Sequence, residues 1–302
     1  MAADTYASLS DLRVAAYLSQ VLLQILHETG DLKNTMVEVP FDASMGTAAA
    51  KLGLYQPLDA FSAPGEDTAL SVTNITDSSA TLTVARYGLQ RELTDLAQIT
   101  GQPDLDRLAA DMALSAGYTI GGLLTAAYTN LATTAGTSGV NLNVDAIYAA
   151  QYALQLSNVP GPYYCVLHMK QWNNFQASLR GEVGAVQFQA ATDEMLAIKG
   201  PSFKGTWHGI EFYTHASVAT DGTDRIGAMY GRGCYAYTEA PIAKVAPFFQ
   251  RGVIPVGAMM AVEFVRGSVG ASKGKTFAIG HYYPAVAEVE DLRGCRILGK
   301  AA

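Results

Sequence analysis

The chain has 302 residues, of which 49% are hydrophobic and only 16% are charged, and its formal net charge at pH 7 is −7. This length is enough to bury a sizeable core, as one large domain or two smaller ones. An acidic chain without clusters of Lys or Arg is not expected to bind nucleic acid by neutralising phosphates. No apolar run approaches the roughly 20 residues that a membrane helix needs, and the N-terminus lacks the pattern of a secretory signal. These features predict a chain that is soluble and intracellular when it is made.

A first helix is predicted over residues 5–29. Its apolar side chains recur at roughly helical spacing, and Gly30 ends the pattern. The residues of this stripe are Leu9, Leu12, Ala16, Leu18, Leu22, Ile25 and Leu26. Because the helix is far from the other predicted helices in the sequence, it fits either an ordinary core helix or a helix that packs on a neighbouring chain.

The next part of the chain, up to about residue 90, contains no convincing helix. Residues 36–41 are predicted to form a strand that Pro40 stops. Residues 42–67 mix Gly, Ala, Ser and Pro with a few large apolar side chains, and so long a connection is normally functional or an interaction arm. Alternating runs at 69–76 and 80–90, split by three polar residues, predict a hairpin or strand pair.

A long helix is predicted from Pro103 to about residue 132, and the rest of the chain is organised around it. Proline suits the first helical turn, and apolar side chains in steps of three and four residues predict one buried stripe. Gly117, Gly121 and Gly122 lie in its middle, where each glycine costs about 1 kcal/mol relative to alanine. They indicate either close packing of the helix or a bend point that lets one subunit occupy slightly different environments.

The second half of the chain mixes helices and strands without a regular βαβ period. Helices are predicted at 144–156 and 170–179, on either side of an apolar strand at 163–169 that is typical of a sheet covered on both faces. Residues 180–205 are expected to be loop-rich. Further strands are predicted at 209–217, 225–230, 235–237, 259–266, 275–282 and 285–289, with a glycine-rich tip at 267–274. The predicted fold class is α+β.

No motif in the sequence indicates catalysis. The stretch from Gly231 resembles the dinucleotide motif GxGxxA, but strand residues follow it where a helix would have to begin. The five histidines include no pair at metal-ligand spacing, and no GxSxG nucleophile motif occurs. The three cysteines are too few and too scattered for a disulfide framework. We therefore expect no catalytic, cofactor-binding or metal-binding residues.

The order of the predicted elements resembles that of the major capsid proteins of tailed bacteriophages, which have the HK97-type fold. Five stretches resemble strands of the coat proteins of short-tailed and related phages. They are RYGLQRELTD at 86–95 before the long helix, YYCVLHMKQW at 163–172, WHGIEF at 207–212, RIGAMY at 225–230 and MMAVEFVR at 259–266.

The resemblance implies a capsid subunit in four parts. These are an N-arm at 1–35, an extended loop at 36–80, a peripheral domain at 81–139 and 256–302 that contains the long spine helix, and an axial domain at 140–255. Such a protein self-assembles through pentamers and hexamers into an icosahedral head shell that encloses the phage double-stranded DNA genome. It binds that DNA without sequence specificity, needs no cofactor, is made in the host cytoplasm and resides in the virion capsid.

The extended loop is expected to lie over a neighbouring subunit, because its apolar side chains have no obvious core to fill. The residues expected to make this contact are Leu54, Leu58, Phe61, Val72 and Ile75. Its strand pair is suited to adding to a neighbour's sheet edge. Some members of the family join subunits by Lys–Asn isopeptide bonds near the loop tip, whereas Lys51 is near the loop base, so no covalent crosslink is expected. The short N-terminus implies a separate scaffolding protein, and the family implies a portal and allows a cement protein.

Two other functions fit the sequence. An encapsulin-like compartment shell shares the fold and differs in its cargo, which would be an enzyme instead of phage DNA. A cytosolic α+β enzyme with a site assembled from distant residues belongs to a different class, and a concave pocket that gathers titratable residues would mark it.

Overall fold

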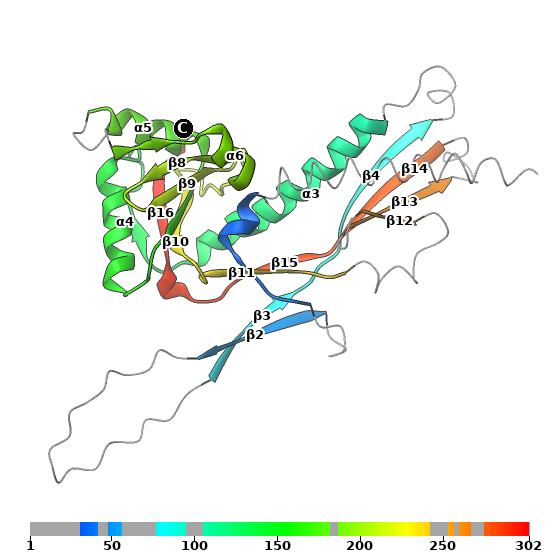
Figure 1. Cartoon of the computed structure of the whole chain (residues 1–302), viewed down its shortest axis with the longest axis horizontal. Coiled ribbons are helices and arrows are strands. Elements are labelled where there is room, and N and C mark those ends of the chain that lie inside the picture. Colours follow the sequence, from blue (N-terminus) through cyan, green and yellow to red (C-terminus); the bar gives the residue numbers. More distant parts are fainter. Residues whose placement is uncertain are drawn as a thin grey trace, which may run out of the picture.

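The computed structural model describes residues 31–41, 48–55, 77–94, 105–181, 187–241, 253–256, 260–266 and 275–301. Figure 1 shows a body of sheet and helices at one end, a long helix that runs from this body along a second sheet, and a narrow ribbon that projects away from both. The predicted helix at 5–29, the run at 69–76 and the tip at 267–274 lie outside the described residues. In the part of the chain that is described, no helix has the length and apolar character to cross a membrane.

The long helix α3 spans Leu105–Ala127 and continues into a 3-10 turn, η3, at Tyr128–Asn130, so the α-helix ends before the predicted residue 132. The predicted stripe is confirmed at Met112, Ala116 and Ile120, which are buried. One turn later the buried residue is Leu124, whereas Leu123, which the spacing predicted, is half-buried. At 1.5 Å per residue, its 23 residues extend over roughly 35 Å. The helix therefore reaches from the body to the second sheet and packs against both (Figure 1).

The body is built on a seven-stranded sheet with the order β5-β16-β10-β6-β9-β8-β7. The central strand β6 runs parallel to β9 and antiparallel to β10, which in turn pairs antiparallel with β16. The strands are β5 (Thr134–Ala135), β6 (Tyr163–Leu167), β7 (Gln189–Ala190), β8 (Phe203–Trp207), β9 (Ile210–Thr214), β10 (Asp224–Gly231) and β16 (Gly294–Lys300). The C-terminal strand β16 is thus hydrogen-bonded in the body, although the resemblance to capsid proteins implies a peripheral position for residues 256–302.

Helices and further apolar side chains cover both faces of this sheet, as the apolar run at 163–169 predicted. Alternate β6 residues enter different cores: Cys165 and Leu167 pack with α4 (Val144–Leu156) and α5 (Met169–Leu179), while Val166 packs with α3. Stacked rings fill the first core, with the Phe175 and Phe212 centroids 5.0 Å apart. These two helices confirm the predictions at 144–156 and 170–179.

Local capping explains where the two body helices begin. The Asn143 side chain accepts a hydrogen bond from the backbone N–H of Ala146, which satisfies one of the free donors at the start of α4. His168 does the same for α5 by accepting from the N–H of Lys170. A third helix, α6 (Asp193–Lys199), and the strand β8 lie in the segment predicted to be loop-rich, so that prediction is wrong there. Both elements are short, and β8 pairs with β9, the next strand along the chain.

Two smaller sheets lie beyond the body. The four-stranded antiparallel sheet has the order β12-β13-β14-β4, and the three-stranded sheet has the order β1-β11-β15. Tyr283 alone separates β14 from β15, so one stretch of chain serves both sheets. Their strands are β1 (Val37–Glu38), β4 (Tyr87–Thr94), β11 (Tyr235–Glu239), β12 (Val253–Val256), β13 (Met260–Arg266), β14 (Lys275–Tyr282) and β15 (Pro284–Glu288).

The ribbon consists of β2 (Ala49–Tyr55) and β3 (Asp77–Thr83), which pair antiparallel. The predicted hairpin with its turn at residues 77–79 is wrong, because those residues lie inside β3 and Ser79 pairs with Gly53. The run at 80–90 is also divided: its first part belongs to the ribbon, and its second part forms β4 and pairs with β14. Pairing partners in sheets are chosen by packing between distant segments, which the alternation pattern of one segment does not reveal.

Candidate functional site

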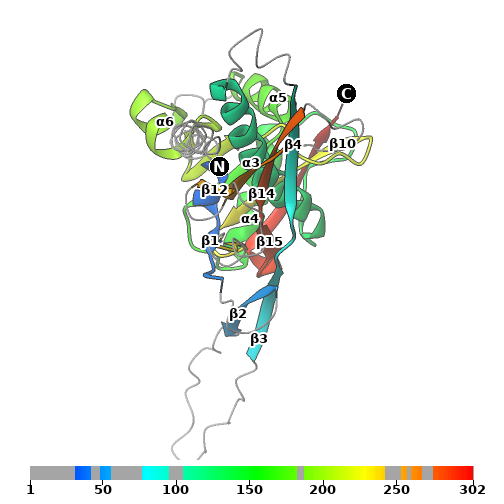
Figure 2. The ribbon, with the colours of Figure 1, turned by 90° about the vertical axis from the view of Figure 1, so that its right-hand side faces the viewer.

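The most distinctive surface of the molecule is the β2–β3 ribbon, which extends well clear of the body in two perpendicular views (Figures 1 and 2). Only its base is buried: Leu82 has none of its surface exposed and Ala50 has 5% exposed, whereas Lys51, Gly53 and Thr81 are exposed. An isolated two-stranded ribbon is at best marginally stable in water. Within the described residues, the ribbon is therefore stabilised mainly at its base.

The base of the ribbon is fixed by a small apolar core. Leu82 and Ala50 pack there with Val39, Ala236 and Ala285, which come from the segment after β1, from β11 and from β15. The backbone N–H of Val84 donates to the carbonyl of Ala48 at 2.7 Å, which closes the ribbon on the body side. The three-stranded sheet is thus the platform on which the ribbon stands.

The N-terminal end of the described chain is held beside this platform. The 3-10 helix η1 (Asp31–Thr35) places the Lys33 ammonium 2.5 Å from a carboxylate oxygen of Glu239, and the Tyr282 hydroxyl donates to the same oxygen. The Thr35 and Tyr230 hydroxyls are 2.8 Å apart. Burial and the neighbouring Glu239 carboxylate raise the pKa of Tyr282, so its hydroxyl keeps the proton that it donates. These contacts fix η1 against β10, β11 and β14.

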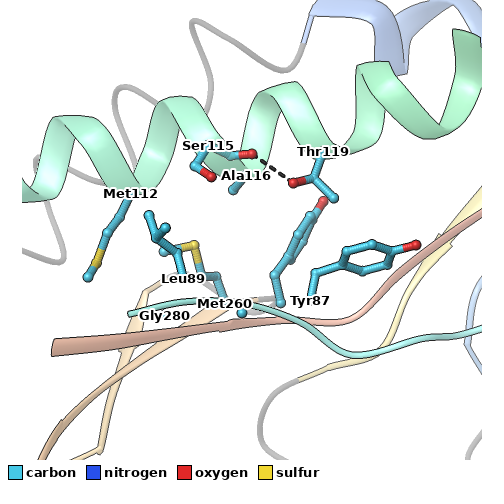
Figure 3. A pocket seen from close by; sticks show the side chains of 10 residues that line it. Tyr87, Leu89, Met112, Ser115, Ala116, Thr119, Met260 and Gly280 are labelled. Carbon is cyan, nitrogen blue, oxygen red and sulfur yellow. Dashed lines mark hydrogen bonds between the residues drawn. The ribbon is translucent and has the colours of Figure 1, made fainter. Parts of the chain in front are cut away.

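A groove lies between α3 and the four-stranded sheet (Figure 3). It encloses about 100 Å³, and its walls are the side chains of Tyr87, Leu89, Met112, Met260 and Tyr282, together with small residues. Its main polar feature is internal to the helix, because the Thr119 hydroxyl donates to the Ser115 carbonyl at 2.8 Å. Among the described residues that line this groove, none carries a carboxylate, imidazole, thiol or amine.

Other described side chains with reactive groups are buried and protonated, or already paired. Burial raises the pKa of the Cys165 thiol well above its ordinary value and raises that of Cys295 to about 12, so both stay protonated and unreactive. In the second pocket, near Trp207, the Glu211 carboxylate is already paired with Lys199 at 2.5 Å. Within the described ranges no group of three or more His, Cys, Asp or Glu side chains is placed to hold a metal ion.

The structure describes only part of the predicted contact set. Leu54 lies in β2 opposite Ser78, with its side chain outside the described residues, and the other four predicted contact residues, Leu58, Phe61, Val72 and Ile75, also lie outside them. Of the helix glycines, Gly121 is tightly packed: a Cβ atom built there would be 2.3 Å from Nε2 of His215. At Gly122 the nearest atoms, from Ser217, would be 4.0 Å away.

Sequence reasoning missed the polar contacts at the base of the ribbon, notably Arg86, Glu263 and His281. One signal for them was available. Glu263 interrupts the apolar strand at 259–266, and a charged residue in such a run is seldom buried unless it is paired. The sequence alone does not show which side chain provides the partner.

Comparison with known proteins agrees with this geometry at the level of the fold. No model of a protein family and no curated protein matches the sequence. Among solved structures, the capsid of Ralstonia phage GP4 superposes with a TM-score of 0.60 at 10% identity, over 89% of this chain and 87% of that one. The head structure of Helicobacter pylori bacteriophage KHP40 gives 0.59 at 9% identity, over 90% and 89%. The SrpI encapsulin complex from Synechococcus elongatus PCC 7942 gives 0.60 at 13% identity, over 88% and 85%.

These similarities define an α+β fold that runs through nearly the whole chain. The chain has the HK97-type fold of phage capsid proteins, as the order of its elements predicted.

Proposed function

We propose that this chain is the major capsid protein of a tailed bacteriophage, with a structural and non-enzymatic role. It self-assembles through pentamers and hexamers into an icosahedral head shell that encloses the phage double-stranded DNA genome. The observation that supports this most directly is the extent of the similarity to phage capsids, which includes close to nine-tenths of both chains in the GP4 and KHP40 comparisons.

The ribbon supports assembly on physical grounds. Lys51, Gly53, Ser79 and Thr81 of its strands are exposed, and a lone pair of strands gains little stability from its own hydrogen bonds. A neighbouring subunit beneath the ribbon supplies the missing contacts. We propose that Leu54, Leu58, Phe61, Val72 and Ile75 make them, since apolar side chains in a long connection otherwise remain in water.

We also propose the division of the chain into an N-arm at 1–35, an extended loop at 36–80, a peripheral domain at 81–139 and 256–302, and an axial domain at 140–255. The last strand, β16, pairs with β10 in the seven-stranded sheet and so contributes to the axial unit. The spine helix is proposed to bend at Gly117, Gly121 and Gly122, so that subunits can occupy different shell positions. Of Gly121 and Gly122, whose surroundings are described, Gly122 has the more open surroundings.

Further partners follow from the phage assignment. A separate scaffolding protein directs shell size, a portal occupies one vertex, and a cement protein is compatible with the fold. The packaged DNA is contained without sequence-specific contacts, which suits a chain with a net charge of −7. The mature protein resides in the virion capsid after synthesis in the host cytoplasm.

A compartment shell is the second candidate, and the SrpI encapsulin similarity favours it specifically. The two functions differ in what the shell contains. Shells purified from the native source carry double-stranded DNA in the first case and a packaged protein in the second, so nuclease treatment and mass spectrometry of the contents distinguish them.

The decisive experiment is light scattering and negative-stain microscopy of the purified protein, alone and together with the product of the adjacent reading frame. Rings of five and six subunits or closed shells are expected. A matched variant in which residues 49–83 are replaced by a short Gly-Ser turn should keep the helical content of the body and fail to close shells. A monomer under every condition, or normal shells without the ribbon, would refute the proposal.

A further inference from the structure

The helix α4 carries large apolar side chains on the face that is turned away from the core of the body. Tyr148, Tyr152 and Leu156 follow one another at intervals of four residues, so they form one row along the helix. Their exposed fractions are 41%, 66% and 71%. Figure 1 shows that α4 forms the edge of the body on the side away from the four-stranded sheet. We call these three side chains the α4 stripe.

The composition of α4 is that of a helix with both faces buried. Ile147, Ala150 and Leu154, on the opposite face from the stripe, already pack in the core of the body. The helix contains no Lys or Arg, and its single acidic residue, Asp145, is in the first turn. The neighbouring helix α6, by contrast, has three charged residues in seven. A helix that is apolar on all sides normally has its whole surface covered, and a single chain covers only one face of α4.

One end of the α4 stripe is held in place by its neighbours. The centroid of the Tyr148 ring is 5.0 Å from that of Trp207, and the Tyr148 hydroxyl is 3.3 Å from Nε2 of His208. The Gln151 side chain donates to the carbonyl of His208 at 3.1 Å. A hollow of about 330 Å³ lies beside these rings, lined in part by Trp207, His208 and Glu211. Side chains that are fixed before binding lose little conformational entropy when a partner arrives.

We propose that the α4 stripe is a contact surface for a second copy of this chain. The inference rests on the proposed function and deepens it, because it names one surface through which the subunits assemble. Contact with a neighbour removes from water three side chains that the fold of one chain leaves exposed. Tyr148 and the hollow beside it supply the pre-formed part of the contact, while Tyr152 and Leu156 have the larger exposed fractions.

The charge of the chain indicates which partner fits this face. Two copies with a net charge of −7 each repel one another, so they associate best through a surface where no charge has to be desolvated. The α4 face meets this condition, since Asp145 at its first turn is its one charged residue. DNA would require Lys or Arg, which α4 lacks. Permanent contacts between identical chains are also more apolar than other interfaces, and tyrosine is enriched in interfaces generally.

The first test is the assembly of Tyr152→Ser, followed by light scattering over a range of protein concentrations. Because 66% of Tyr152 is exposed in the single chain, its replacement should leave the urea midpoint of the unassembled protein unchanged. An aromatic side chain at the centre of an interface contributes strongly to association. Its loss should therefore raise the protein concentration needed for assembly at least about tenfold.

Two further variants complete this test. Leu156→Ser removes a different part of the α4 stripe and should also raise the concentration needed for assembly, so the result does not depend on one substitution. Asn173→Ser is the matched control, because Asn173 is exposed on the helix α5 of the same body and lies outside the stripe. It should assemble at the wild-type concentration. Assembly of both Tyr152→Ser and Leu156→Ser at the wild-type concentration would overturn the inference.

Photo-crosslinking identifies the partner directly. Full-length chains with benzoylphenylalanine at position 152, half of them labelled with ¹⁵N, are mixed, assembled and irradiated. Crosslinked peptide pairs that join a labelled to an unlabelled chain are expected, because the partner is a second copy. If microscopy shows rings or closed shells and position 152 yields no mixed pair, the inference is overturned while the proposed function stands. A wild-type chain that remains monomeric under every condition refutes both.

Discussion

Replacement of the two adjacent glycines of α3 by alanine, one at a time, provides a sharp test of how this helix is packed. Alanine removes the cost of a mid-helix glycine, about 1 kcal/mol at either position. On propensity alone both variants would be more stable, and the sequence offers no reason to separate them. The structure predicts opposite outcomes.

At Gly121 a new Cβ atom would be 2.3 Å from Nε2 and 2.6 Å from Cε1 of His215, far inside the 3.5–4.0 Å of a favourable contact. The ring is not free to retreat, because its Nδ1 accepts from the N–H of Ser217 at 3.2 Å and its backbone N–H bonds to Leu167. Overpacking of this kind costs about 1–3 kcal/mol, and displacement of the ring adds about 1 kcal/mol for the hydrogen bond. After the gain in helix propensity, Gly121→Ala should be less stable by about 1–3 kcal/mol.

Gly122→Ala is the matched control. Its nearest neighbours are the Cβ and Oγ atoms of Ser217 at 4.0 Å, which is ordinary contact, so the variant should gain up to about 1 kcal/mol. Urea unfolding followed by circular dichroism measures both variants on the same day and in the same assembly state. A Gly121→Ala variant as stable as the wild type would refute the packing argument. Shell closure by Gly122→Ala tests the bend separately, because that variant is expected to fold well, and normal shells would argue against a hinge there.

Three further outcomes are expected. Lys33→Met leaves the Glu239 carboxylate buried without its cation and should destabilise the protein by about 3 kcal/mol, and the double variant with Glu239→Gln should recover most of that loss in the same urea assay. Burial, together with the positive charges of Arg225 and Lys170, lowers the pKa of His168 from 6.5. The unfolded chain therefore binds a proton at this histidine more readily than the folded chain. The free energy of unfolding should be at its full value above about pH 6.5 and should fall as the pH drops below it. The variant His168→Asn, which keeps a capping side chain, should not show this loss in the same urea assay. Lys51 lies on the exposed part of β2 near the ribbon base, so boiled denaturing gels of assembled particles should show single chains; a ladder of multimers would contradict this.

Local patterns in the sequence were sufficient for three of the described helices and missed the short helix α6. The spacing of apolar residues predicted α3, α4 and α5, because helix formation depends on residues three and four positions apart and on capping side chains nearby. The continuous apolar run at 163–169 also predicted that this strand, β6, is buried on both faces. The order of these elements was enough to resemble the HK97-type fold, which structural comparison confirms.

The pairing of the strands and the polar contacts at the ribbon base depended on the tertiary structure. The run at 80–90 looks like one strand of a hairpin, yet its two parts pair with β2 and β14, whose sequences lie far away in opposite directions. Likewise, the close approach of His215 to Gly121 and the bonds that join Arg86 to Glu263 through His281 bring together residues from distant segments. The sequence by itself determined the three longer described helices, α3, α4 and α5, and the apolar run of β6. Only the tertiary structure decided which strands share a sheet and which charges meet, because those choices minimise the free energy of the whole chain and not of any one segment.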